Sequence, residues 1–323
     1  MAGEHEEAAS FWLPDDILIH ILSNLPAKSV VRFRSVSRSW RDMLSSASFV
    51  ELHLRRANRP DQLKVFFLSA KPTDAEHPDK CYFYSRQLPG GPAKKLMRED
   101  FAHGQFAAPV TKPLHGLVLM RCTSLHGGYY VCNPSTNAVL ALPDSKFPLK
   151  SSLRIIPHSS RRDWTPGYTT VSYGFGYCSA TGEHKVVRLF SDTFSFQAAD
   201  TCSEVFVLDT PAFWRPTAQQ PPPECTFEED NPAVFLNGLL YFLCRNGGVI
   251  TFNVSDETFG SAPPPPVDVD EVGEVTLTEF DGCLGAFYQE AHSDNYAYHI
   301  WLLRDHAHEA AHWEQLCRID MAA

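Results

Sequence analysis

From residue 60 to the end of the chain, apolar residues occur in short runs that Gly, Pro, Asn and Asp interrupt. Runs of about four to eight residues between turn residues are typical of β-strands, and no long helical pattern lies between them. This part of the chain therefore predicts an all-β architecture. The expected strands cover residues 63–68, 117–120, 129–132, 138–142, 153–156, 171–177, 186–190, 205–208, 239–244, 249–252, 275–277, 284–288 and 299–303.

A weak internal repeat favours a β-propeller. An apolar residue, a polar residue and a glycine precede an apolar strand at Gly116, Gly238 and Gly282. Gly238 and Gly282 are 44 residues apart, a normal spacing for a propeller blade. We expect each glycine to supply the positive φ of a tight hairpin. At about 40 to 45 residues per blade, residues 60–323 would form about six blades, and radial closure would leave few exposed strand edges.

The segment before residue 60 has a helical pattern instead. Ile17, Ile21 and Leu25 recur every four residues, which places them on one face of a short helix. Pro26 cannot continue that helix, because it lacks the backbone N–H. A second short helix follows, Ser37 is placed to cap a third, and a fourth completes the segment. So small a bundle cannot bury all its apolar residues, so we expect part of this surface to meet a partner.

Charge separates the same two parts of the chain. Residues 11–59 hold eight Lys and Arg against four Asp and Glu, whereas residues 60–323 hold 20 against 31. The net charge of −10 argues against a general nucleic-acid binder. The basic run at 28–41 could alternatively be a helix that binds nucleic acid. Electrostatic attraction to an acidic protein partner accounts better for this run. We therefore divide the chain into a disordered acidic tail at 1–10, a helical module at 11–59 and a β domain at 60–323.

The N-terminus lacks the apolar run of a signal peptide, and no apolar stretch approaches the ~18 residues of a spanning helix. The nine cysteines are therefore expected to be free thiols. These features predict an intracellular protein of the cytoplasm, the nucleus or both, with no membrane partner.

The helical module resembles the F-box of the large plant family over about residues 11–50. The motifs that carry the resemblance are Leu-Pro-Asp-Asp-Ile-Leu at 13–18, Leu-Pro-Ala-Lys-Ser at 25–29 and Val-x-x-x-Trp at 36–40. The family usually has Cys before that Val and Cys or Ser after it, and here both are Ser, at Ser35 and Ser37.

The resemblance implies that this module docks on an SKP-type adaptor, which links it to a cullin–RING ubiquitin ligase. Matched by motif position, nine residues would form or support the docking surface, and the sequence does not separate those that touch the adaptor from those that hold the module together. They are Leu13, Pro14, Ile17, Ile21, Leu22, Leu25, Val30, Val36 and Trp40.

The β domain resembles the F-box-associated domains that follow plant F-boxes. The supporting motifs are His-Gly-Leu at 115–117, Asn-Pro-Ser-Thr at 133–136, Tyr-Gly-Phe-Gly-Tyr at 173–177, Asn-Gly-Leu-Leu-Tyr at 237–241 and Ile-Trp-Leu-Leu at 300–303. The resemblance implies a propeller-like domain that presents the substrate. No substrate-binding residue can be named, because propeller specificity lies in loop side chains.

The sharpest enzyme-like motif is His308-Glu309-Ala-Ala-His312, which matches the zinc-binding H-E-x-x-H pattern. A catalytic zinc needs three protein ligands. Arg318 occupies the position at which a third zinc-binding His would stand. Glu314 is the last Glu of the sequence, so no distant downstream Glu is present to serve as the third ligand. We therefore expect a surface turn here, and we predict no catalytic residue, no metal and no cofactor.

The sequence thus predicts a substrate-receptor subunit of a cullin–RING ligase that acts by proximity and carries out no bond chemistry itself. One alternative is an interaction protein that keeps the helical module but binds no adaptor. The other alternative is a zinc hydrolase that uses His308, Glu309 and His312.

Overall fold

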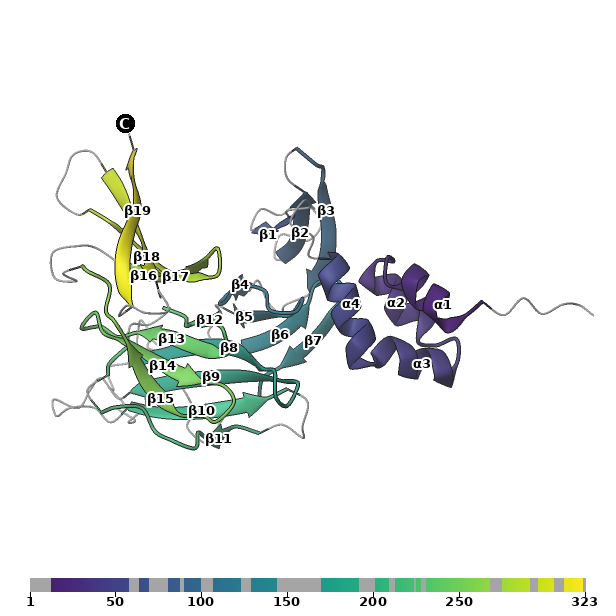
Figure 1. Cartoon of the computed structure of the whole chain (residues 1–323), viewed down its shortest axis with the longest axis horizontal. Helices are drawn as coiled ribbons and strands as arrows, with labels where there is room; N and C mark the ends of the chain where they lie inside the picture. Colours follow the sequence, from purple (N-terminus) through teal and green to yellow (C-terminus); the bar gives the residue numbers. More distant parts are fainter. Residues whose placement is uncertain are drawn as a thin grey trace, which may run out of the picture. The chain divides into compact units, whose positions relative to one another are not determined.

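The chain divides into two compact units, one of residues 1–104 with 133–139 and the other of residues 105–132 with 140–323. None of the helices in the described ranges has the length and apolar character needed to cross a bilayer. The computed structural model shown in Figure 1 describes residues 13–57, 64–69, 81–87, 90–99, 107–122, 129–143, 170–191, 201–208, 213–223, 225–227, 231–267, 275–290, 296–304 and 311–321.

Four short helices follow residue 13, as the sequence predicts. They are α1 (Asp15–Leu22), α2 (Ala27–Phe33), α3 (Arg38–Ser45) and α4 (Ala47–Ala57). The Ser37 hydroxyl caps α3 by accepting the Trp40 backbone N–H at 3.1 Å. Helix α1 ends before the predicted stop at Pro26, because Ser23 and Asn24 donate side-chain hydrogen bonds to the His20 carbonyl at 3.0 and 2.7 Å.

The rest of the described chain is β-structure, arranged as five antiparallel meanders in which strand order follows sequence order. The first sheet is β1 (Lys64–Ser69), β2 (Cys81–Gln87) and β3 (Ala93–Glu99). The four-stranded sheets are β4 (Ala107–Pro109), β5 (Val118–Cys122), β6 (Tyr129–Asn133), β7 (Ala138–Ala141); β8 (Thr170–Cys178), β9 (Glu183–Ser191), β10 (Thr201–Val207), β11 (Arg215–Pro216); β12 (Val234–Leu236), β13 (Leu239–Leu243), β14 (Val249–Asn253), β15 (Phe259–Ala262); and β16 (Val275–Phe280), β17 (Cys283–Gln289), β18 (Tyr296–Arg304), β19 (His312–Met321).

These sheets confirm the predicted all-β region and its propeller-like character. Twelve of the thirteen expected apolar runs coincide with strands, and the thirteenth, 153–156, lies outside the described residues. The part of the chain that the structure describes contains five sheets, where the length predicted about six blades. The polar strands β3 and β19 were not among the expected strands, because their sequences lack a continuous apolar run.

The repeated glycines form tight hairpins, as expected. Gly116, Gly238 and Gly282 have φ of 80°, 82° and 75°. The residue before each glycine also has a positive φ, 50° in all three cases, which defines the two-residue turn that fits strand twist. The repeat did not predict this second position of positive φ, which His115 occupies in the first hairpin.

Hydrophobic clusters lie between consecutive sheets of the second unit. Strand β9 contributes to two of them, because its side chains alternate between its two faces. Val186 packs with Leu119 and Val131 of the sheet β4–β7, whereas Val187 and Leu189 pack with residues of the sheet β12–β15. Sheet β8–β11 therefore has a hydrophobic cluster on each of its two faces.

Candidate functional site

The helical module has a small core. Leu22, Val30, Leu44 and Phe49 are buried together, one from each helix. Trp40 packs against this core, with its ring 5.8 Å from the Phe33 ring in an edge-on arrangement. These contacts show which apolar residues hold the four helices together.

Other apolar residues of the module point to solvent. Leu13, Ile17 and Ile21 are 52%, 46% and 47% exposed. The four-residue spacing of Ile17 and Ile21 places them on one stripe along α1, and Leu13 lies just before the start of that helix. Val36, in the turn before α3, is 60% exposed. We call Leu13, Ile17, Ile21 and Val36 the exposed apolar set. Exposed apolar side chains gathered in one small module are typical of a protein interface.

The nine predicted docking residues therefore divide by exposure, which the sequence left open. Leu22 and Val30 belong to the buried core, and Leu25 and Trp40 are half-buried against it. The remaining five are exposed: Leu13, Pro14, Ile17, Ile21 and Val36. Sequence reasoning missed Val31, which is also exposed on α2, because a short helix pattern does not decide which of two adjacent valines faces outward.

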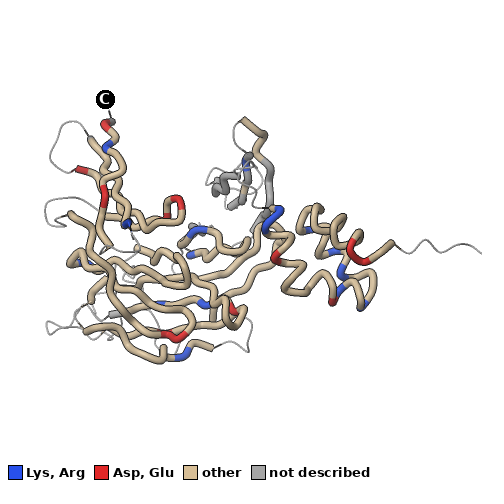
Figure 2. The backbone as a smooth tube through the Cα atoms, in the orientation of Figure 1, with Lys and Arg blue, Asp and Glu red and all other residues tan. Residues whose placement is uncertain are grey.

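An arginine of α4 connects that helix to the C-terminal end of α1 by hydrogen bonds. Arg56 donates to the His20 carbonyl at 2.8 Å and to the Ser23 hydroxyl at 2.5 Å. A guanidinium also interacts favourably with the carbonyl end of a helix. Further Lys and Arg positions lie along α2, α3 and α4 (Figure 2), so the exposed apolar set belongs to a basic module.

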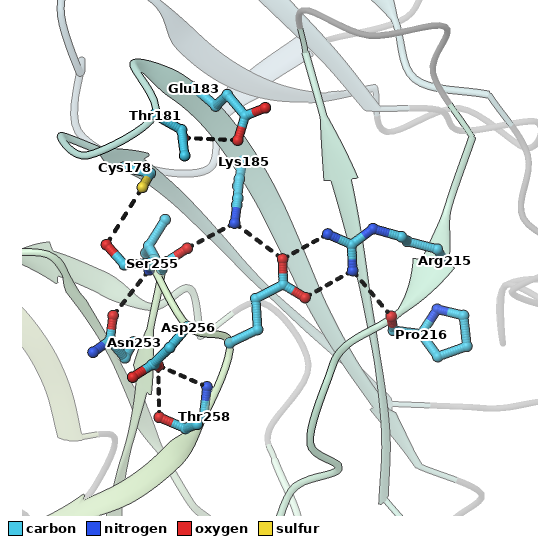
Figure 3. Close-up of polar contacts among 12 residues, drawn as sticks. Cys178, Thr181, Glu183, Lys185, Arg215, Pro216, Asn253, Ser255, Asp256 and Thr258 are labelled. Atoms are coloured by element: carbon cyan, nitrogen blue, oxygen red, sulfur yellow. Dashed lines mark hydrogen bonds and ion pairs between the residues drawn. The ribbon is translucent and has the colours of Figure 1, made fainter.

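In the second unit, a buried ionic cluster connects the sheets β8–β11 and β12–β15 (Figure 3). Lys185 of β9 donates to Glu257 at 3.0 Å and to the Val254 carbonyl at 2.8 Å. Arg215 of β11 donates to both Glu257 oxygens, at 2.7 and 2.6 Å. The side chains of Lys185 and Glu257 are only 6% and 7% exposed. This cluster fixes the β14–β15 turn against the neighbouring sheet.

The electrostatics of Glu257 follow from these contacts. Burial would raise the pKa of its carboxyl, but the hydrogen bonds from Arg215 and Lys185 outweigh burial and hold that pKa at about 2. Beside the cluster, a 3.3 Å hydrogen bond between Cys178 Sγ and Ser255 Oγ lowers the pKa of that thiol to about 7, together with hydrogen bonds to Thr181. These contacts do not indicate a ligand-binding role for the cluster, because Lys185, Arg215 and Glu257 neutralise one another's charge.

A second buried ion pair lies on the opposite face of β9. Arg188 donates to Glu204 of β10, with its Nε 2.8 Å from Oε2, and both side chains are buried. The Arg188 guanidinium lies 4.7 Å from the Trp214 ring centre, a cation–π contact. The two faces of β9 thus each bury a charge with its partner.

The zinc-hydrolase alternative gains no support. His308 and Glu309 lie outside the described residues, and His312 begins the strand β19, opposite Arg304 of β18. The H-E-x-x-H chemistry needs both imidazoles on one helix face, and a strand does not provide that geometry. In the described ranges, no three His, Cys, Asp or Glu side chains gather as metal ligands.

A small helical module with an exposed apolar set, followed by a propeller-like β domain, is the architecture of a two-module adaptor protein. Residues 11–52 match the F-box domain, and residues 58–316 match the F-box associated beta propeller domain. The chain therefore belongs to the F-box proteins that carry an F-box-associated propeller domain, and proteins of this class are in general non-catalytic adaptors.

Similar curated proteins include three F-box proteins of Arabidopsis thaliana. F-box protein At3g57590 is 23% identical over 91% of this chain and 69% of its own length. Putative F-box protein At3g10240 is 24% identical over 94% of this chain and 72% of its own length. F-box protein At2g21930 is 24% identical over 92% of this chain and 70% of its own length.

Proposed function

We propose that this protein is the substrate-receptor subunit of an SKP–cullin–F-box ubiquitin ligase. In this role residues 11–59 dock on the SKP-type adaptor, and residues 60–323 hold a target protein within reach of the ligase. The chain contributes proximity and carries no catalytic residue, metal or cofactor of its own. An intracellular location, in the cytoplasm, the nucleus or both, goes with this role.

The observation that carries the proposal is the separation of core and surface in the F-box. Leu22, Val30, Leu44 and Phe49 form the module's buried core, yet Leu13 remains exposed before α1, and Ile17 and Ile21 remain exposed along it. Burying such side chains against a partner is favourable by about 1.5–3 kcal/mol each. An adaptor that covers these three side chains explains why apolar residues stand at exposed positions there.

The decisive test is a binding measurement between the full chain and a purified SKP-type adaptor. We expect the triple variant Leu13→Ala, Ile17→Ala and Ile21→Ala to weaken binding by at least a hundredfold, because about 2.7 kcal/mol lost at the interface corresponds to that factor. The exposed positions make no core contact, so the variant should keep the helical circular dichroism of the wild type.

Val50→Ala is the matched control, because Val50 is an exposed apolar residue of α4 outside the docking set. It should leave the affinity within about twofold. The proposal fails if the triple variant binds the adaptor as tightly as the wild type, or if the wild type does not bind it at all.

A further inference from the structure

Two histidines that no motif links in the sequence meet in the second unit. His115 lies in the hairpin between β4 and β5, and His184 is the second residue of β9. The His115 Nδ1 and His184 Nε2 atoms are 3.2 Å apart. Nitrogen atoms bound to a tetrahedral Zn²⁺ at ~2.0–2.1 Å lie about 3.3 Å from each other, so the pair already has the separation of two ligands on one ion.

Aromatic rings fix the orientation of both imidazoles. The Tyr177 ring meets His115 edge-on at 4.4 Å and His184 at 4.8 Å between ring centres. The Phe175 ring stacks on His184 at 5.8 Å. Ligand side chains held in this way lose little freedom when they bind an ion, which favours binding.

The pair is also chemically ready to coordinate. An imidazole coordinates a metal through the lone pair of a ring nitrogen, and an ordinary histidine is largely in the neutral form that carries this lone pair at pH 7 and above. His115 is exposed and His184 is half-buried, so an ion from solvent can reach the pair. Imidazole nitrogen suits Zn²⁺, Cu²⁺ and Ni²⁺ better than Mg²⁺ or Ca²⁺.

We propose that His115 and His184 form a two-imidazole site for a divalent transition-metal cation, with water completing the coordination. The ion replaces the hydrogen bond between the two rings and connects the sheet β4–β7 to the sheet β8–β11. Such a site stabilises the β domain in proportion to the logarithm of the ion concentration above its dissociation constant.

The variants follow from the local backbone. His115→Asn removes the imidazole but keeps the turn, because Asn tolerates the φ of 50° and occupies the same position before Gly238. His184→Gln removes the second ligand within a regular strand. His312→Ala is the control, since it removes an exposed histidine of β19 that lies on another sheet.

Titration of the full chain with ZnCl₂ by calorimetry should show one site per chain. We expect His115→Asn and His184→Gln each to weaken it by tenfold or more and to abolish the zinc-dependent rise in melting temperature, while His312→Ala changes neither. Cu²⁺ bound to the wild type should show hyperfine coupling to two imidazole nitrogens in electron paramagnetic resonance, and to one in His115→Asn. The proposal is overturned if the wild type takes up no zinc, or if both ligand variants bind it as the wild type does, which would indicate adventitious surface histidines only.

Discussion

At the scale of single residues, Glu257 is the side chain on which the charge balance of the sheet β8–β11 most depends. It is the carboxylate partner of both Lys185 and Arg215, and Lys185 is nearly inaccessible to water. Removing one partner of a buried ion pair costs about 3–5 kcal/mol, because the other charge stays buried without compensation. Arg215 is far more exposed and can turn to water when its partner is lost.

Glu257→Gln should therefore lower the free energy of unfolding by about 3–5 kcal/mol at pH 7. Urea unfolding followed by tryptophan fluorescence measures this loss. Glu314→Gln, which breaks the exposed pair with Arg304, is the control and should have no resolvable effect. Equal effects of the two substitutions would show that the Lys185–Glu257 contact contributes no more than a surface pair.

The same carboxylate gives the fold an acid sensitivity. Its pKa is about 2 when folded and close to the ordinary ~4.3 when unfolded, so its stabilisation is complete above pH ~4.5. It disappears as pH falls from there towards 2. Melting temperatures across this range should fall more steeply for the wild type than for Glu257→Gln, and parallel curves would contradict the assignment.

At the scale of helices and strands, local patterns predicted much of the structure. The four-residue spacing, Ser37 and the proline breaks give the helices, and runs such as 186–190 and 249–252 give the buried strands. Strands without such runs, β3 among them, were not predicted, because their strand conformation depends on pairing with neighbouring strands and not on their own sequence. Which F-box residues face outward also escaped prediction, because the adjacent Ile21 and Leu22 differ only in the direction that tertiary packing gives them.

Two glycines of β8 have a role that the sequence motif at 173–177 did not explain. A Cβ on Gly176 would lie 2.7 Å from Val254 Cγ2, and one on Gly174 would lie 2.8 Å from Leu240 Cδ1. Both distances are shorter than real carbon contacts, so the glycines allow β8 to approach the sheet β12–β15 closely.

Gly176→Ala should destabilise the β domain by about 1–3 kcal/mol through overpacking. The control is Gly285→Ala in β17, where the added methyl would meet Thr278 Cγ2 at 3.3 Å and needs only a small adjustment. Thermal unfolding of both variants tests this, and an unchanged melting temperature for Gly176→Ala would refute the close-approach argument.

At the scale of the whole molecule, the uneven charge along the chain has a kinetic consequence. The basic F-box is covalently joined to a strongly acidic β domain, so the two parts attract partners of opposite sign. If the adaptor presents an acidic surface, Arg32 and Arg38, both exposed, accelerate the encounter more than they strengthen the complex.

Arg32→Gln with Arg38→Gln should therefore slow association with the adaptor severalfold at low salt, with little change in dissociation, and the difference should shrink at high ionic strength. Surface plasmon resonance at several salt concentrations measures both rates. Arg55→Gln is the control, because Glu51 already pairs with that charge on α4. A faster dissociation of the double variant, with association unchanged, would show direct contact instead of long-range attraction.

The two buried ion pairs of β9 bear on how a chain of similar sheets avoids assembling wrongly. Meanders of nearly equal length and composition are prone to exchange places during folding, because each offers the others a comparable apolar face. Arg188 pairs with Glu204 of the adjacent strand β10 in the same sheet, whereas Lys185, on the opposite face of β9, reaches Glu257 only across the contact with the sheet β12–β15. A sheet β8–β11 that stacked upside down, or beside the wrong neighbour, would separate Lys185 from Glu257 and leave a charge without water or partner. We expect the Lys185–Glu257 pair to act chiefly against misassembled states, so that its apolar replacement would preserve native stability while lowering the yield of correctly refolded protein.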